Sequence, residues 1–158
     1  MKNTAIFQTI LGPVVISEQD EAVTEVFFAK GKQYSGNKQT TPLLKEAEKQ
    51  LLEYLSGIRK TFDLKLAVKG TEFQKLVWES LHSIPYGETH SYKQVAEMIG
   101  RPEASRAVGM ANSKNPILIL TPCHRILGSD GKLVGYAGGL ELKKKLLELE
   151  KSHVTCHV

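Results

Sequence analysis

The chain has 158 residues, of which 41% are hydrophobic and 24% are charged. This composition is typical of a globular protein, and the length fits one large domain or two small ones. No apolar run reaches the ~18 residues of a membrane span, and the first residues show no signal peptide. Two cysteines are too few for a disulfide framework, so the sequence predicts a protein of the reducing cytoplasm.

The charge balance is basic, with a formal net charge of +4. Between residues 91 and 132, six basic residues face three acidic ones. Such an excess suits contacts with the phosphate backbone of a nucleic acid. A generic basic surface accounts for the same excess, so charge alone leaves both interpretations open.

The first 68 residues predict a small sheet with one helix. Three runs rich in Val, Ile, Thr and Phe indicate strands, at residues 4–11, 14–17 and 23–28. Gly12-Pro13 predicts the turn between the first two, and residues 62–68 alternate like a further short strand. This segment has no cysteine and no histidine, so it cannot supply the usual ligands of zinc.

The helix of this segment is predicted to begin at Pro42. Thr41 is a plausible N-cap, Pro42 suits the first helical position, and Gly57 can end the helix. Apolar residues recur between them at helical spacing, at Leu44, Ala47, Leu51 and Leu55.

From Gly70 onward the pattern changes to short helices. Thr71 is predicted to cap the first, and Ser91 the second, which Gly100 ends. Their apolar stripes are Phe73, Leu76, Val77 and Leu81, and Tyr92, Val95, Ala96 and Ile99. A third helix is predicted from Glu103 to Ser113. Short helices joined by Gly-containing turns are typical of the helix-turn-helix motif, although generic helical cores look alike.

The third helix has unusually small side chains, and Arg106 is its one long cation. The small residues are Ala104, Ala107, Gly109 and Ala111. They would let the helix backbone approach another core helix, or the minor groove of DNA, which is about 6 Å wide. In the second case Arg106 could insert into the duplex.

The segment after Asn115-Pro116 leads to the first cysteine. Residues 117–120 are continuously apolar and predict a buried strand, and Pro122 then stiffens the backbone before Cys123. Two Gly-rich turns follow, at residues 128–131 and 135–139, and in the second the backbone N–H groups could face a ligand.

A last helix is predicted from Leu140 to Glu150. Its buried stripe is Leu142, Leu146 and Leu149, and lysines 143–145 are expected on a solvated face. The tail, residues 152–158, has no clear structure, and its histidines and cysteine, His153, Cys156 and His157, are interpreted as incidental. A thiol switch or an adventitious metal contact is the alternative.

Residues 122–125 read Pro-Cys-His-Arg, which places a thiol beside an imidazole and a guanidinium. The thiolate is the nucleophilic form of cysteine, and a base or a positive charge raises its population. Cys123 is therefore a candidate covalent catalyst. Taken alone, such a pair is more typical of a small buried Cys123 beside solvated His124 and Arg125, and the surrounding residues reverse this interpretation.

Several motifs in order resemble the O6-alkylguanine-DNA alkyltransferase family, over roughly residues 41–151. They are Gly-Thr-Glu-Phe-Gln at 70–74, Val-Trp at 77–78, Ile-Pro-Tyr-Gly-Glu-Thr at 84–89, Ser-Tyr at 91–92, Arg-Ala-Val-Gly at 106–109, Asn-Pro at 115–116, Pro-Cys-His-Arg at 122–125 and Gly-Tyr-Ala-Gly-Gly at 135–139. The first 40 residues match only in outline.

The resemblance implies direct-reversal DNA repair without a cofactor or metal. An alkylated guanine is flipped out of double-stranded DNA, and Cys123 takes the alkyl group from O6, or from O4 of thymine, in a single turnover. His124 acts as base through a bridging water, Glu150 orients it, and Asn115 braces the turn near the thiol.

The resemblance also implies the residues that bind DNA and the flipped base. Tyr92 and Arg106 act on the target nucleotide and the gap that it leaves, from the minor groove. The further DNA-binding residues are Ser91, Ala107 and Arg125. The base pocket consists of Tyr136, Ala137, Gly138 and Ile126, with backbone groups of Cys123, Ile126 and Ala137 reading the guanine edge.

The implied fold is α+β, with an RNase H-like α/β domain at residues 1–68 and a winged-helix-like helix-turn-helix domain at residues 69–158. The resemblance implies a cytoplasmic monomer with no membrane contact. Two other classes fit parts of the sequence. One is a non-enzymatic module that recognises alkylated DNA with Cys123 merely buried, and the other is a Cys-His hydrolase that turns over repeatedly.

Overall fold

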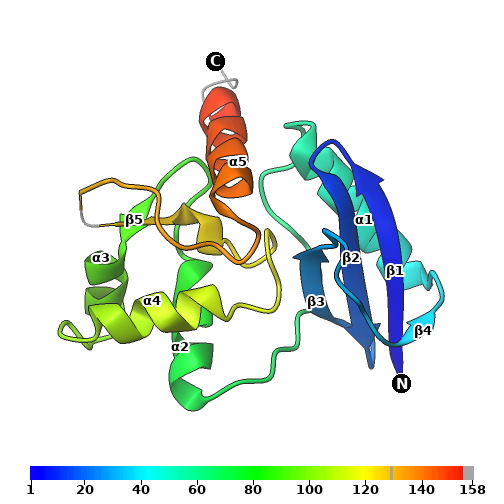
Figure 1. Ribbon diagram of the computed structural model, residues 1–158, viewed down its shortest axis with the longest axis horizontal. Helices are drawn as coiled ribbons and strands as arrows, with labels where there is room; N and C mark the ends of the chain where they lie inside the picture. The colour runs from blue at the N-terminus through cyan, green and yellow to red at the C-terminus, as the bar shows by residue number, and fades with distance from the viewer. Residues whose placement is uncertain (129, 155–158) are drawn as a thin grey trace. The chain divides into compact units, whose positions relative to one another are not determined.

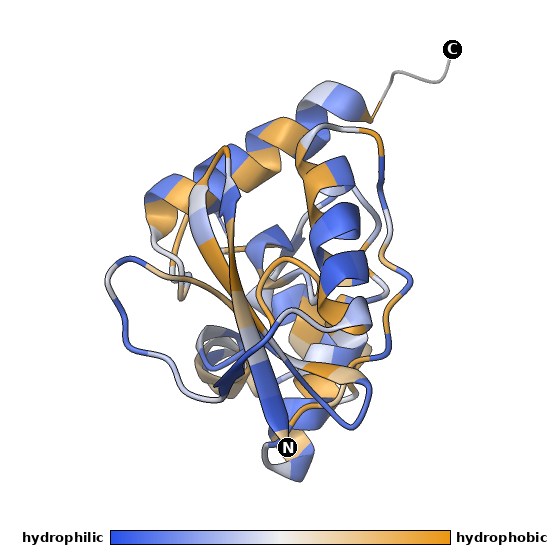
Figure 2. Ribbon diagram, turned by 90° about the vertical axis from the view of Figure 1, so that its right-hand side faces the viewer, coloured by the Kyte–Doolittle hydropathy of each residue, from blue (hydrophilic) through white to orange (hydrophobic). Residues whose placement is uncertain are grey.

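The computed structural model describes residues 1–128 and 130–154. The chain forms two compact units, Met1–Val68 and Lys69–Val158, and each is described by itself. Hydrophobic (orange) and hydrophilic (blue) residues alternate around the helices in Figure 2, as expected for helices that bury one side. No helix of the described part is long and apolar enough to cross a membrane.

The N-terminal unit is a four-stranded sheet covered by one helix (Figure 1). The strand order is β3-β2-β1-β4, in which β1 and β2 and also β2 and β3 are antiparallel, whereas β4 is parallel to β1. Their bounds are β1 Lys2–Thr9, β2 Gly12–Gln19, β3 Ala22–Phe28 and β4 Asn37–Lys38. Helix α1, Pro42–Leu55, contacts β1 and β2.

The predicted strands of this unit are present, with two differences in detail. The turn lies at residues 10–11 instead of Gly12-Pro13, because Gly12, at φ +102°, already pairs with Thr9 at the start of β2. The strand predicted at residues 62–68 is wrong, since this stretch contributes only an isolated bridge between Leu66 and Val23.

The start of α1 is confirmed in detail. The Thr41 hydroxyl accepts a hydrogen bond from the Leu44 backbone N–H, and Pro42 occupies the first turn. The predicted apolar residues Leu44, Ala47, Leu51 and Leu55 are all buried. The periodicity therefore marked the side of the helix that packs on the sheet.

The C-terminal unit gathers α2, α3 and α4 into a helical cluster (Figure 1), in which each helix contacts the other two. Their bounds are α2 Glu72–Leu81, α3 Tyr92–Met98 and α4 Ser105–Ser113. Both predicted N-caps are present as capping boxes, Thr71 with Gln74 and Ser91 with Gln94. The apolar side of α2 includes Trp78, whose Nε1 donates to the Ala111 carbonyl over 2.8 Å, whereas Leu76 is exposed.

The predicted strand at residues 117–120 is wrong, although all four residues are buried. The segment is a tight turn, in which Leu120 N donates to Leu118 O and Thr121 N to Ile117 O. Ile119 has φ +70°, which is strained for a β-branched residue. Asn115 forms hydrogen bonds to the backbone N–H and C=O of Ile117, so those groups are not free to join a sheet.

The last helix, α5, is longer than predicted and spans Leu140–His153. Leu142 and Leu146 are buried as expected, and Leu149 is half-buried. The solvated face predicted for the lysines holds for Lys144 and Lys145 but is wrong for Lys143, which has no exposed surface. This buried ammonium belongs to the site described next.

Candidate active site

The Pro-Cys-His-Arg motif folds into a buried 3-10 turn, η1, Cys123–Arg125. Strand β6, Ile126–Leu127, follows directly and pairs in parallel with β5, His90–Ser91, which leads into α3. Cys123 is 1% exposed and His124 is fully buried. This pairing fixes the cysteine turn relative to the first residues of α3.

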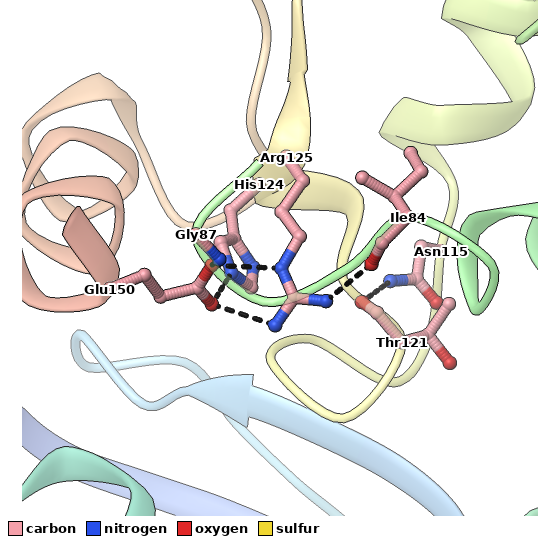
Figure 3. Close-up of polar contacts among 7 residues, drawn as sticks. All are labelled: Ile84, Gly87, Asn115, Thr121, His124, Arg125 and Glu150. Carbon is pink, nitrogen blue, oxygen red and sulfur yellow. Dashed lines mark hydrogen bonds and ion pairs between the residues drawn. The ribbon is translucent and has the colours of Figure 1, made fainter. Parts of the chain in front are cut away.

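The carboxylate of Glu150 is the centre of the site (Figure 3). Its Oε2 accepts from His124 Nε2 over 2.7 Å and from Arg125 Nη2 over 2.9 Å. Its Oε1 accepts from Arg125 Nε over 2.9 Å and from the Gly87 backbone N–H over 3.0 Å. Four donors thus surround a carboxylate that is fully buried on α5. A buried carboxylate needs this degree of pairing to remain ionised.

Arg125 does not occupy the DNA-binding position that the sequence predicted. Its side chain is nearly buried, and besides its two bonds to Glu150 its Nη1 donates to the Ile84 carbonyl over 2.8 Å. All three guanidinium nitrogens are therefore engaged inside the unit. Arg125 acts as the counter-ion of Glu150, a pairing that no local pattern predicts because the two residues lie 25 positions apart.

The protonation states of the pair follow from this geometry. Burial by itself would raise the pKa of Glu150, but hydrogen bonds and charge from His124 and Arg125 hold it well below its usual range. Burial lowers the pKa of His124 despite the opposing effect of Glu150, so the ring is neutral near pH 7. Because the ionised carboxylate only accepts, Nε2 carries the proton and Nδ1 is the basic nitrogen.

Asn115 braces the turn that carries the cysteine. Its Nδ2 donates to the carbonyls of Ile117 and Thr121, both over 3.1 Å, and its Oδ1 accepts from the Ile117 N–H over 3.0 Å. A hydrogen bond from Asn115 also lowers the pKa of Cys123, which places the amide beside the sulfur. The family resemblance implied a bracing role for this residue.

Burial raises the pKa of the Cys123 thiol to about 11, although Asn115 and the charge of Lys143 oppose the shift. The resting thiol is therefore protonated at pH 7. A neutral His124 and a protonated thiol together form an acid–base pair in which transfer of one proton creates the nucleophile.

Lys143 is a functional residue that the sequence reading missed. Its Nζ donates to the carbonyls of Val134 over 2.7 Å and Gly135 over 3.1 Å. Burial lowers the pKa of Lys143 to about 8, while the nearby Cys123 opposes this. The sequence does place Lys143 next to the apolar stripe of α5. Lysine side chains often lie along apolar surface with the ammonium in water, however, so this position predicted a solvated lysine.

The loop that Lys143 holds leads directly into three of the predicted pocket residues, 136–138. Tyr92 Oη also donates to the Val134 carbonyl, over 3.3 Å, so α3 and α5 hold the same loop. The Tyr136 hydroxyl is buried without a hydrogen-bond partner among the described residues, and Cys123 and Glu150 act electrostatically on it. Gly138 and Ile126 are buried and Ala137 is exposed.

The predicted DNA-binding residues of α4 face solvent. Arg106 and Ala107 are exposed, while Val108 and Ala111 on the other side of the helix are buried. Ser91 uses its hydroxyl to cap α3, accepting from the Gln94 N–H over 3.0 Å.

Of the tail residues, His153 contacts the Leu149 carbonyl through Nδ1. Cys156 and His157 lie outside the described residues. The described residues therefore do not test whether the tail acts as a thiol switch or contacts a metal.

Together these features define a class: a unit with a three-helix cluster and a buried cysteine beside a His–Glu pair. Residues 72–152 match the family model described as "6-O-methylguanine DNA methyltransferase, DNA binding domain". The chain belongs to the family of methylated-DNA–protein-cysteine methyltransferases.

Similar proteins cover nearly the whole chain. The methylated-DNA–protein-cysteine methyltransferase of Methanosarcina acetivorans is 49% identical, over 94% of this chain and 97% of its own length. The constitutive methylated-DNA–protein-cysteine methyltransferase of Bacillus subtilis is 43% identical, over 91% and 92%. The crystal structure of Mycobacterium tuberculosis OGT in complex with DNA is 40% identical, covers 96% of this chain and 94% of that chain, and superposes with a TM-score of 0.90.

The geometry of Arg125 predicts that Arg125→Met destabilises the protein without removing a DNA contact. The substitution leaves the Glu150 charge buried without its main partner, which costs about 3–5 kcal/mol. Urea unfolding measures this loss. The salt dependence of DNA binding should keep its slope, whereas loss of a phosphate contact would lower the slope by about one.

The burial of Lys143 predicts that Lys143→Met raises the pKa of Cys123 further. The lysine charge, which is present below its pKa of about 8, favours the thiolate, so its removal slows the alkylation of Cys123 by iodoacetamide at pH 7 by about tenfold. Mass mapping separates Cys123 from Cys156. Lys144→Met, which removes an exposed lysine of the same helix, is the control, and an equal loss of rate in both variants would contradict the prediction.

Proposed function

We propose that this protein repairs alkylated DNA by transferring the alkyl group from O6 of guanine to Cys123. The observation that carries the proposal is the bond between Glu150 and His124 beside a buried cysteine, in a chain of this family. The similar proteins of known name are methylated-DNA–protein-cysteine methyltransferases, and one was crystallised in complex with DNA. O4 of thymine is the second proposed position of attack.

The reaction balances because the guanine gains one proton for the one that the thiol loses, so His124 ends neutral. His124 Nδ1 takes the thiol proton through a bridging water, and the Cys123 thiolate attacks the alkyl carbon. The carbon–O6 bond breaks, and its electron pair stays on the guanine, which takes up a proton at N1. The products are S-alkylcysteine and unmodified guanine. A thioether is a poor leaving group, so the site is not regenerated and each molecule reacts once.

The electrostatics of the site support this sequence of steps. Glu150 stays ionised beside Arg125 and stabilises the imidazolium that forms transiently at His124. Lys143 and Asn115 favour the thiolate. A buried thiol with a raised pKa reacts only slowly with solvent reagents near pH 7. In the proposed complex, a bound base places its alkyl carbon at the sulfur, so the thiolate reacts as soon as it forms.

We infer that DNA binds along the exposed side of α4. In this arrangement Arg106 and Ala107 enter the minor groove, Ser91 and Tyr92 lie at the target phosphate, and Arg106 fills the gap that the flipped base leaves. Tyr136, Ala137, Gly138 and Ile126 form the base pocket. The exposure of Arg106 and Ala107 supports this assignment.

We further propose that the N-terminal unit is an RNase H-like domain at residues 1–68. The C-terminal unit is then a winged-helix-like domain at residues 69–158, and the protein works as a cytoplasmic monomer without a cofactor. The division of the chain after Val68 and the helical cluster of α2, α3 and α4 support these assignments.

The proposal predicts a single gain of about 14 Da in the intact protein after incubation with a duplex that contains one O6-methylguanine. The added mass maps to Cys123 and never exceeds one equivalent. Cys123→Ala should abolish transfer and retain DNA binding. Repaired DNA without a mass change would indicate a hydrolase, and binding without repair would indicate a recognition module.

The proposed role of Arg106 predicts that Arg106→Ala slows repair in duplex DNA by about tenfold or more, because flipping costs a few kcal/mol and every 1.4 kcal/mol is tenfold. Transfer from the free base O6-benzylguanine, which needs no flipping, should change little. Lys49→Ala, an exposed cation on α1, is the matched control. Equal losses on both substrates would remove Arg106 from the flipping step.

A further inference from the structure

One buried side chain of α4 has no place in the mechanism described so far. Asn112 is 2% exposed, and its Nδ2 donates to the backbone carbonyl of Cys123 over 3.3 Å. Its Oδ1 is buried and has no hydrogen-bond partner among the described residues. Buried polar atoms without a partner are rare in native proteins and call for an explanation.

The orientation of this amide follows from its neighbour. A carbonyl oxygen only accepts hydrogen bonds, so the NH2 group of Asn112 must face the Cys123 carbonyl. The atom left over is therefore an acceptor, Oδ1. Because both atoms belong to one planar amide, this acceptor lies beside the backbone of the nucleophilic residue.

The position of Asn112 brings it close to any substrate of Cys123. In the proposed base pocket, a base that presents its alkyl carbon to the sulfur lies against the backbone of Cys123 and of Ile126, three residues further on. α4 carries Asn112 on its buried side and Arg106 on its exposed side. In the proposed complex the same helix therefore contacts the duplex through Arg106 and lies beside Cys123 through Asn112. An orphan acceptor at this place suits a ligand with an N–H donor.

We propose that Asn112 Oδ1 accepts a hydrogen bond from the exocyclic 2-amino group of the alkylated guanine. Asn112 is then a specificity-determining residue, and this inference rests on the proposed function. O6-alkylguanine offers the 2-amino group as its donor, since its N1 carries no proton. O4-alkylthymine has no N–H donor on its ring, so it leaves Oδ1 unpaired. The structure thus favours guanine over thymine as the substrate base.

The test varies the residue and the amino group together. Single-turnover transfer rates are measured for the wild type and for Asn112→Leu on matched duplexes that contain O6-methylguanine or O6-methylhypoxanthine, which lacks only the 2-amino group. The wild type should prefer the guanine lesion by about tenfold, and in the variant this preference should shrink by about fivefold or more. The cost of flipping each lesion cancels in the comparison of the two proteins.

Two results would overturn the inference. A wild type that does not distinguish the two lesions has no contact with the amino group. A variant that slows on both lesions by the same factor shows that Asn112 merely holds the Cys123 carbonyl. Ser113→Ala, on the same helix, removes a hydroxyl that donates only to the Met110 carbonyl and should keep the wild-type ratio.

Failure of the proposed function would look different, because the wild type would then transfer no methyl group from either lesion. Far-UV circular dichroism checks that Asn112→Leu is folded. If it is not, Asn112→Met takes its place, since the flexible methionine side chain fills irregular gaps without an amide oxygen. The same ratio then decides the question.

Discussion

The site depends on one buried negative charge. Glu150 lies on the last helix and binds two segments that are distant in sequence: the loop of Gly87, through its backbone N–H, and the cysteine turn, through the His124 ring and the Arg125 guanidinium. Taking a carboxylate out of water costs several kcal/mol, which only near-complete hydrogen bonding and an opposite charge offset. The four donors meet this requirement. They also fix α5, the cysteine turn and the loop after α2 in one arrangement.

That constraint determines the chemistry of the neighbouring groups. Burial lowers the pKa of His124, and the charge of Arg125 adds to this effect, so His124 remains neutral beside the ionised Glu150 and keeps a basic nitrogen for the thiol proton. The thiol itself is held in its protonated form by burial, against the opposing charge of Lys143. The site therefore stores a nucleophile in an unreactive state, which suits a protein whose active cysteine can be used once.

The segment just before the cysteine has a strained backbone that hydrogen bonds hold in place. Ile119 holds a left-handed backbone conformation inside the apolar turn, and Asn115 fixes that turn through three hydrogen bonds. On the far side of the cysteine, β6 pairs with β5 and so with the start of α3. Lys143 and Tyr92 hold the same Val134 carbonyl. Each contact links the nucleophile to an element that, in the proposed complex, meets DNA.

The sequence by itself determined the features that depend on residues close together along the chain. The capped helices, the N-terminal strands and the nucleophilic motif follow from caps, periodicity and side-chain chemistry, all of which act within a few residues. The tertiary structure alone decided how distant residues pair. It made Arg125 the counter-ion of Glu150 instead of a DNA contact, buried Lys143, turned residues 117–120 away from a strand, and left the Asn112 oxygen unpaired. These outcomes depend on which polar groups share a water-free interior, and no local pattern specifies that.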